Sequence, residues 1–142
     1  MRAQERVAPH PPETIVAIAT AADIVRARQE GRALAGRIGF GGSDLAVIAT
    51  AISELARNIL EYAHQGEIAF AVVQSGARVG IRIEARDGGP GIPDVPRAMQ
   101  PGYTTGKGLG MGLPGVRRLM DDIDVQSSPG LGTRVRASKW RP

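Results

Sequence analysis

Residues 43–62 read SDLAVIATAISELARNILEY, which is the clearest structural signal in the chain. Apolar side chains recur in it at alternating spacings of three and four residues, which is the period of one helix face. The residues on this face are Leu45, Ile48, Ile52, Leu55, Ile59 and Tyr62. Because Ser43 is a suitable N-cap and Gly66 a suitable stop, the pattern predicts one amphipathic helix that packs its apolar stripe against a core.

A polar stripe lies beside the apolar one on the same predicted helix. Glu54, Arg57, Asn58 and Glu61 follow at i, i+3, i+4 and i+7, so they share one side of the helix. The Asn oxygen suits a Mg²⁺ ion held mostly by phosphates and water. The Glu carboxylate can accept a proton from an attacking hydroxyl. The same spacing also occurs on ordinary solvated helix faces, so the stripe alone leaves both interpretations open.

Around this helix, the sequence predicts the order β-α-α-β-β-(α)-α-β-β, in which the helix in parentheses is short. Strands are expected over 13–20, 68–73, 79–86, 125–127 and 133–140, and further helices over 23–38, 95–99 and 114–121. Asp23 is expected to cap the first helix. The order predicts one α/β domain over residues 13–142, a two-layer sandwich with helices on one face of a mixed, mostly antiparallel sheet. Residues 1–12, which contain three prolines, are expected to be a flexible segment.

The composition excludes several classes of protein. The 142 residues include no cysteine, which excludes disulfides, thiol nucleophiles and Cys-ligated metals. No apolar run approaches the roughly 20 residues of a membrane helix, and the N-terminus lacks the apolar region of a secretory signal. A cytoplasmic protein is therefore expected.

The formal net charge of +4 equals the number of basic residues after Asp124. These are Arg134, Arg136, Lys139 and Arg141. They indicate either a solvated strand edge or a patch for nucleic acid or an acidic partner. The first interpretation is favoured, because the chain has no run of five or six like charges and no regularly interleaved aromatic residues.

Glycine is enriched, at 19 of 142 residues or about 13%, against a usual value of about 7%. One cluster, DGGPGIP at 87–93, follows a predicted strand. Its carboxylate can accept a hydrogen bond from an exocyclic amine such as that of adenine, and its glycines let a flat ligand approach the backbone. An ordinary tight turn would have the same composition.

The second cluster, GKGLGMGLPG at 106–115, leads into a predicted helix. Exposed backbone N–H groups and the helix dipole suit a triphosphate there, with Lys107 as a cation. The spacing fits neither a Walker A loop nor a dinucleotide fingerprint. The alternative is a flexible surface loop.

Taken together, these motifs resemble the GHKL ATPase/kinase superfamily, and within it the RsbT-type serine/threonine switch kinases of the stressosome. The resemblance rests on TAISELARNI at 50–59, DGGPGIPD at 87–94 and GLGMGLPGVRRLMD at 108–121. Gly132-Thr133 and the terminal Lys139-Trp140 also fit, so it covers about residues 14–140.

The resemblance implies the Bergerat ATP-binding fold, with ATP and Mg²⁺ as cofactors. It implies that Glu54 is the general base for a substrate Ser or Thr hydroxyl and that Asn58 binds Mg²⁺. Asp87 would accept from the adenine amino group, with support from Thr133. Gly89 and Gly91 would admit the adenine, and the lid around the phosphates would comprise Lys107, Gly108, Leu109, Gly110, Met111 and Gly112. Arg57 or Lys107 would be the cation at the γ-phosphate.

The resemblance further implies a kinase that phosphorylates STAS-domain scaffold and antagonist proteins of a stressosome-like complex. Once released, it would activate a PPM-type phosphatase by partner switching in stress-response signalling. Neither a nucleic acid nor a membrane is an expected partner, and self-association stays open. The alternative is an anti-sigma-factor-type ATP-binding module that acts mainly by sequestering a partner. A histidine-kinase catalytic domain fits less well, because no phosphoacceptor helix is predicted ahead of the domain and His10 and His64 are expected to be solvated.

Overall fold

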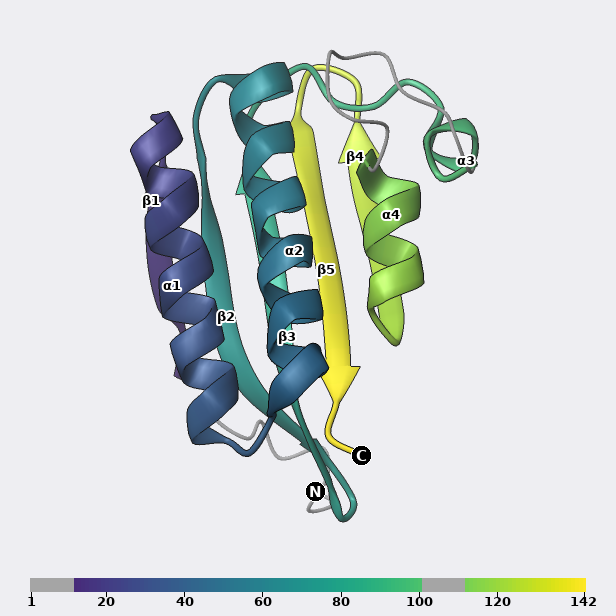
Figure 1. Ribbon diagram of the computed structural model, residues 1–142. Helices are drawn as coiled ribbons and strands as arrows, with labels where there is room; N and C mark the ends of the chain where they lie inside the picture. The colour runs from purple at the N-terminus through teal and green to yellow at the C-terminus, as the bar shows by residue number, and fades with distance from the viewer. Residues whose placement is uncertain (1–11, 101–111) are drawn as a thin grey trace, which may run out of the picture.

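The computed structural model describes residues 12–100 and 112–142. The elements are β1 (Thr14–Ile18), α1 (Ala21–Arg37), α2 (Gly42–Asn58), β2 (Gly66–Ser75), β3 (Arg78–Asp87), α3 (Val95–Ala98), α4 (Gly112–Leu119), β4 (Asp122–Ser128) and β5 (Gly132–Trp140). A π-helical turn, Ile59–Ala63, directly continues α2. Helices α1, α2 and α4 cover one face of the sheet, so the expected two-layer α/β sandwich is confirmed (Figure 1). The segment expected to be flexible lies outside the described residues, except for Pro12.

The five strands follow the order β1-β2-β3-β5-β4, and each of the four pairings is antiparallel. In this register Asp87 lies opposite Gly66 of β2 and Thr133 of β5. Thr133 in turn lies opposite Ser127 of β4. Directly opposed residues of an antiparallel pair point to the same face. Asp87, Thr133 and Ser127 therefore form a row across three strands at one end of the sheet.

The core lies between the helices and the sheet. Ile48, Ile52 and Leu55 of α2 are fully buried, as the apolar stripe predicted. They pack in one cluster with the inward side chains of the sheet, which include Phe70 and Ile83. Tyr62 departs from the prediction, because it is 41% exposed. The π turn is wider than an α-helical turn, so a residue placed by α-helical spacing no longer falls on the buried stripe.

The N-caps of the two long helices lie two or three residues before the predicted ones. Helix α2 has Gly41, not Ser43, at its N-cap. Helix α1 has Thr20 at its N-cap, and Asp23 is the N3 partner of a capping box rather than the cap. The Asp23 carboxylate accepts from the backbone N–H groups of Ala19 and Thr20, and these bonds lower its pKa.

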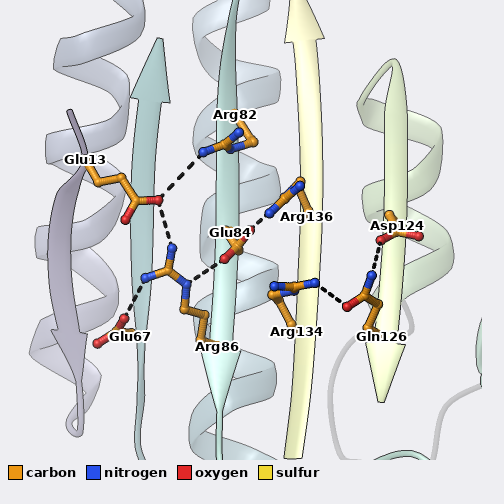
Figure 2. Close-up of polar contacts among 9 residues, drawn as sticks. All are labelled: Glu13, Glu67, Arg82, Glu84, Arg86, Asp124, Gln126, Arg134 and Arg136. Atoms are coloured by element: carbon orange, nitrogen blue, oxygen red, sulfur yellow. Dashed lines mark hydrogen bonds and ion pairs between the residues drawn. The ribbon is translucent and has the colours of Figure 1, made fainter. Parts of the chain in front are cut away.

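A network of arginines and carboxylates lies on the face of the sheet away from the helices (Figure 2). At its centre Glu84 is only 3% exposed. Its two oxygens accept from Arg86 Nε at 2.6 Å and Arg136 Nε at 2.7 Å. Arg86 also donates to Glu67 and Glu13, each at 2.8 Å. Burial alone would raise the pKa of Glu84, but the hydrogen bonds from the two arginines lower it below its usual value.

The basic residues near the C-terminus have intramolecular partners. Arg136 binds Glu84, and Arg134 donates to Gln126 of the neighbouring strand. The Lys139 ammonium donates to the Leu119 carbonyl at the end of α4, and Arg141 donates to the Ile38 carbonyl after α1. These contacts favour a structural use of the charge excess over a free basic patch. No helix within the described ranges is long and apolar enough to cross a membrane.

Candidate active site

A cavity of about 310 Å³ lies between the C-terminal end of α2, the loop after β3 and the start of β5. Six of the residues expected to bind nucleotide or act in catalysis line it: Glu54, Asn58, Asp87, Gly91, Gly112 and Thr133. They come from four separate segments of the chain. The fold therefore brings together most of those predicted site residues that the structure describes, even though they lie up to about 80 residues apart in sequence.

One end of the cavity is polar and is formed by the last turns of α2. Arg57 Nη1 donates to Glu54 Oε1 at 2.5 Å. The Glu54 side chain is 13% exposed and the Arg57 side chain 45%, so the pair lies at the cavity wall with the arginine outward. Asn58 follows on the same helix and lines the cavity beside them.

This donor set fits a Mg²⁺ ion that takes most of its ligands from elsewhere. Asn58 offers an amide oxygen and Glu54 a carboxylate. Among residues 12–100 and 112–142, no group of three acidic or histidine side chains could hold a metal ion by itself. Mg²⁺ is commonly held by one or two protein oxygens together with waters and substrate phosphates, and this end of the cavity has that chemistry.

The other end of the cavity combines an apolar wall with a carboxylate. Ile92, Leu113 and Val135 supply apolar surface, and Asp87 is the last residue of β3. Asp87 Oδ1 accepts from the Gly89 backbone N–H at 2.9 Å, which fixes the carboxylate at the strand end. A carboxylate has room for several donors, so it can also accept from an amine in the cavity. An apolar slot with one fixed acceptor suits a purine base that carries an amino group.

The two glycines expected to admit adenine have different surroundings. Gly91 lines the cavity and has φ +82°, a left-handed conformation that favours glycine. A Cβ on it would contact the Ser128 carbonyl group of the β4–β5 hairpin. Gly89 lies beside the cavity rather than in its wall, and a Cβ there would come within 2.7 Å of Ala63 Cβ at the end of the π turn. Both glycines permit close backbone packing.

The predicted phosphate lid is only partly described. Lys107, Gly108, Leu109, Gly110 and Met111 lie outside the described residues, so their roles stay predictions. Gly112 is the first residue of α4 and lines the cavity. Leu113, which follows it, is buried and also lines the cavity.

Sequence reasoning missed several residues at this site, among them Ile92, Leu113, Val135 and Ser127. Ile92 and Leu113 form part of the apolar wall, and their place within the two glycine clusters could have indicated this. Ser127 stands behind the wall: its hydroxyl accepts from the Ile92 N–H at 2.7 Å and lies 2.8 Å from the Thr133 hydroxyl. A single serine in a predicted strand carries no pattern that would single it out.

Comparisons with known proteins agree with this geometry. The profile of the histidine kinase-like ATPase domain matches residues 17–139. The serine/threonine-protein kinase RsbT of Bacillus subtilis (strain 168) is 51% identical over 128 residues, which cover 90% of this chain and 96% of RsbT. The anti-sigma F factor of Caldanaerobacter subterraneus subsp. tengcongensis is 38% identical over 101 residues, which cover 68% of this chain and 71% of that protein.

Among solved structures, the mycobacterial sensor histidine kinase MprB has the same fold, with a TM-score of 0.54 at 16% identity. The match covers 93% of this chain and 99% of the MprB chain. Together with the match to the histidine kinase-like ATPase domain, this likeness confirms the expected GHKL fold. The chain belongs to the family of histidine kinase-like ATPase domains, and within it to the RsbT-type serine/threonine-protein kinases.

Proposed function

We propose that the cavity binds ATP with Mg²⁺ and that the chain phosphorylates a serine or threonine of STAS-domain partner proteins. One observation carries this proposal: a single cavity joins Glu54 and Asn58 of α2 to Asp87 and Thr133 at the end of the sheet. Phosphoryl transfer needs positioning and charge compensation more than covalent chemistry. A cavity with a base-binding end and a polar end meets both needs.

The base end would hold the adenine. Asp87 accepts from its exocyclic amine, and Ile92 and Leu113 cover its apolar faces. The Gly89 N–H holds one Asp87 oxygen in place, so the acceptor is set before the nucleotide enters. This preorganisation reduces the entropy lost on binding.

The polar end would carry out the transfer. When bound, ATP supplies the phosphoryl group, and Mg²⁺ offsets the charge of its phosphates. Asn58 would hold the metal through its amide oxygen. Glu54 accepts the proton of the substrate hydroxyl, and Arg57 keeps the Glu54 carboxylate oriented along the helix. Lys107 and the glycines of residues 108–112 would enclose the phosphates.

The partner proteins are inferred from the relatives. The high identity to RsbT over nearly the whole chain supports STAS-domain substrates and later activation of a PPM-type phosphatase. The 38% identity to an anti-sigma F factor supports a second candidate, an ATP-binding module that mainly sequesters a partner. The two candidates differ in outcome, because a kinase labels its partner and releases it, whereas a sequestering module keeps an unlabelled complex.

Two substitutions and radiolabelled ATP test the proposal. We expect Glu54→Gln to keep ATP binding in calorimetry but to lower transfer to a STAS-domain protein at least about a hundredfold, the usual contribution of a general base. Asp87→Asn retains the bond to Gly89 but loses the charged acceptor, so it should weaken ATP binding itself. Glu30→Gln, on an exposed part of α1, is the matched control and should change neither.

Three results would contradict parts of the proposal. Normal transfer by the Glu54 variant would exclude this residue as the base. Normal ATP affinity of the Asp87 variant would exclude it as the adenine acceptor. A stable ATP-dependent complex with no labelled partner would favour the sequestering module.

A further inference from the structure

Ser127 of β4 joins two walls of the cavity without lining it. Its hydroxyl accepts from the Ile92 backbone N–H at 2.7 Å, which holds the loop after β3. It donates to the Gly132 carbonyl at 3.1 Å and lies 2.8 Å from Thr133 Oγ1, both at the start of β5. All three contacts are partly buried, and no role in the proposed transfer uses Ser127.

The number of protons in these contacts fixes their direction. A serine hydroxyl has one proton to donate and two lone pairs that accept. The Ile92 N–H takes one lone pair, and the Gly132 carbonyl can only accept, so it takes the Ser127 proton. The third contact, between the hydroxyls of Ser127 and Thr133, is a hydrogen bond only if Thr133 donates its own proton to Ser127. With every contact satisfied, Thr133 has no proton left for the cavity and offers it only lone pairs.

Thr133 and Asp87 are opposed in the β3–β5 register and both line the cavity. We propose that Ser127 is a positioning residue that fixes the Thr133 hydroxyl as an acceptor, so that Thr133 and Asp87 together present two acceptors to an exocyclic amine. This proposal rests on the proposed ATP function. An adenine amine has two hydrogens to donate, whereas a base with a carbonyl at that place would face two acceptors and be rejected.

The first test needs no nucleotide. In the ligand-free protein, hydrogen exchange by NMR should show a protected Ile92 amide. Ser127→Ala removes the acceptor of that amide, so we expect its exchange to become about tenfold faster or more. Ser127→Thr restores the hydroxyl on the same strand and should restore protection. Ser128→Ala, at the next and exposed position, is the matched control.

The second test compares the dissociation constants of ATP and inosine triphosphate, which carries a carbonyl in place of the 6-amino group. Ser127→Ala frees the Thr133 proton, so we expect the preference for ATP to fall by about fivefold to thirtyfold, the range of one or two hydrogen bonds. If Ser127 only stabilised the fold, Ser127→Ala would weaken the binding of both nucleotides equally. The preference for ATP would then stay unchanged, and this result would overturn the proposal. In a Thr133→Val background, Ser127→Ala should have no further effect on the preference.

The outcomes separate this proposal from the function on which it rests. If the unmodified chain binds no ATP, the proposed function fails, whatever Ser127 does. If the unmodified chain prefers ATP and Ser127→Ala keeps that preference in full, the assignment of Ser127 fails and the proposed function stands.

Discussion

Gly91 shapes the cavity through the conformation of its backbone. Its φ of +82° and its contact with the Ser128 carbonyl group both exclude a side chain. The Gly130 N–H, in the same hairpin, donates to the Pro90 carbonyl at 2.7 Å. The loop after β3 is therefore seated on the β4–β5 hairpin, and Gly91 allows the close approach.

We expect Gly91→Ala to lower the free energy of unfolding by about 1–3 kcal/mol, because it combines a strained backbone with a steric contact. ATP affinity should fall as well, since the displaced loop carries Ile92. Gly88→Ala is the matched control: a Cβ there has no heavy atom within 4 Å, so stability should stay nearly unchanged. Equal losses in the two variants, measured by urea denaturation, would argue against the hairpin contact.

The predictability of individual residues depended on how unusual their setting was. A carboxylate that ends a strand before three glycines, as Asp87 does, is rare enough to notice. Ser127 has no such setting, because its importance arises only from strand pairing with Thr133. Glu84 lies on the face of the sheet away from the helices, yet it is buried. Its burial could not be predicted, because one of the two arginines that cover it, Arg136, comes from the neighbouring strand β5.

At the scale of the element, α1 contains two glycines with opposite surroundings. Gly31 is buried, and a Cβ there would lie 2.7 Å from the Phe70 ring and also contact Ile52. Gly36 is exposed and has no heavy atom within 4 Å of such a Cβ. Gly31 thus allows α1 to pack closely against α2 and β2, whereas Gly36 only weakens the helix.

We therefore expect the same substitution to have opposite effects at the two positions. Gly31→Ala should destabilise the domain by about 1–3 kcal/mol through overpacking. Gly36→Ala should stabilise it by about 0.5–1 kcal/mol through helix propensity. Urea denaturation of both variants measures the two changes. A stable Gly31 variant would mean that α1 can move away from the sheet at little cost.

The existence and order of the elements could be predicted, but their ends could not. The apolar stripe of α2 is long and regular, and the strand expected over 79–86 is observed as β3, Arg78–Asp87. The helix starts were shifted because the residues that cap them, Thr20 and Gly41, are common in loops. The π turn was missed because local sequence does not distinguish it from a further α-helical turn.

At the scale of the whole molecule, the charged network ties strands together on the face of the sheet opposite α1, α2 and α4. Glu84 of β3 binds Arg136 of β5, and Arg86 reaches Glu67 of β2 and Glu13 beside β1. The long arginine stems cover the central carboxylate, which explains its burial on an open face. The network therefore helps to hold the strands together on this face, as the apolar core does on the other.

Glu84→Gln should lower the free energy of unfolding at neutral pH by about 1–3 kcal/mol, less than for a fully buried pair because both arginines are partly exposed. The pKa of Glu84 is lower in the folded than in the unfolded chain, so its contribution is present above its usual pKa of 4.5 and is lost as the pH falls through the lowered value. The difference between the two proteins should therefore shrink with acidification. Denaturation at a series of pH values measures this difference, and a difference that does not change with pH would exclude the negative charge of Glu84 as its source.

The row formed by Asp87, Thr133 and Ser127 also has a kinetic consequence. Its members meet α2 only after chain segments distant in sequence have come together, and closing such loops is slow compared with forming a helix. The cavity is therefore expected to be completed late in folding. A nucleotide that recognises only the completed cavity would slow unfolding and leave refolding unchanged. The supply of ATP would then set how long each folded molecule persists, and not how fast new ones form.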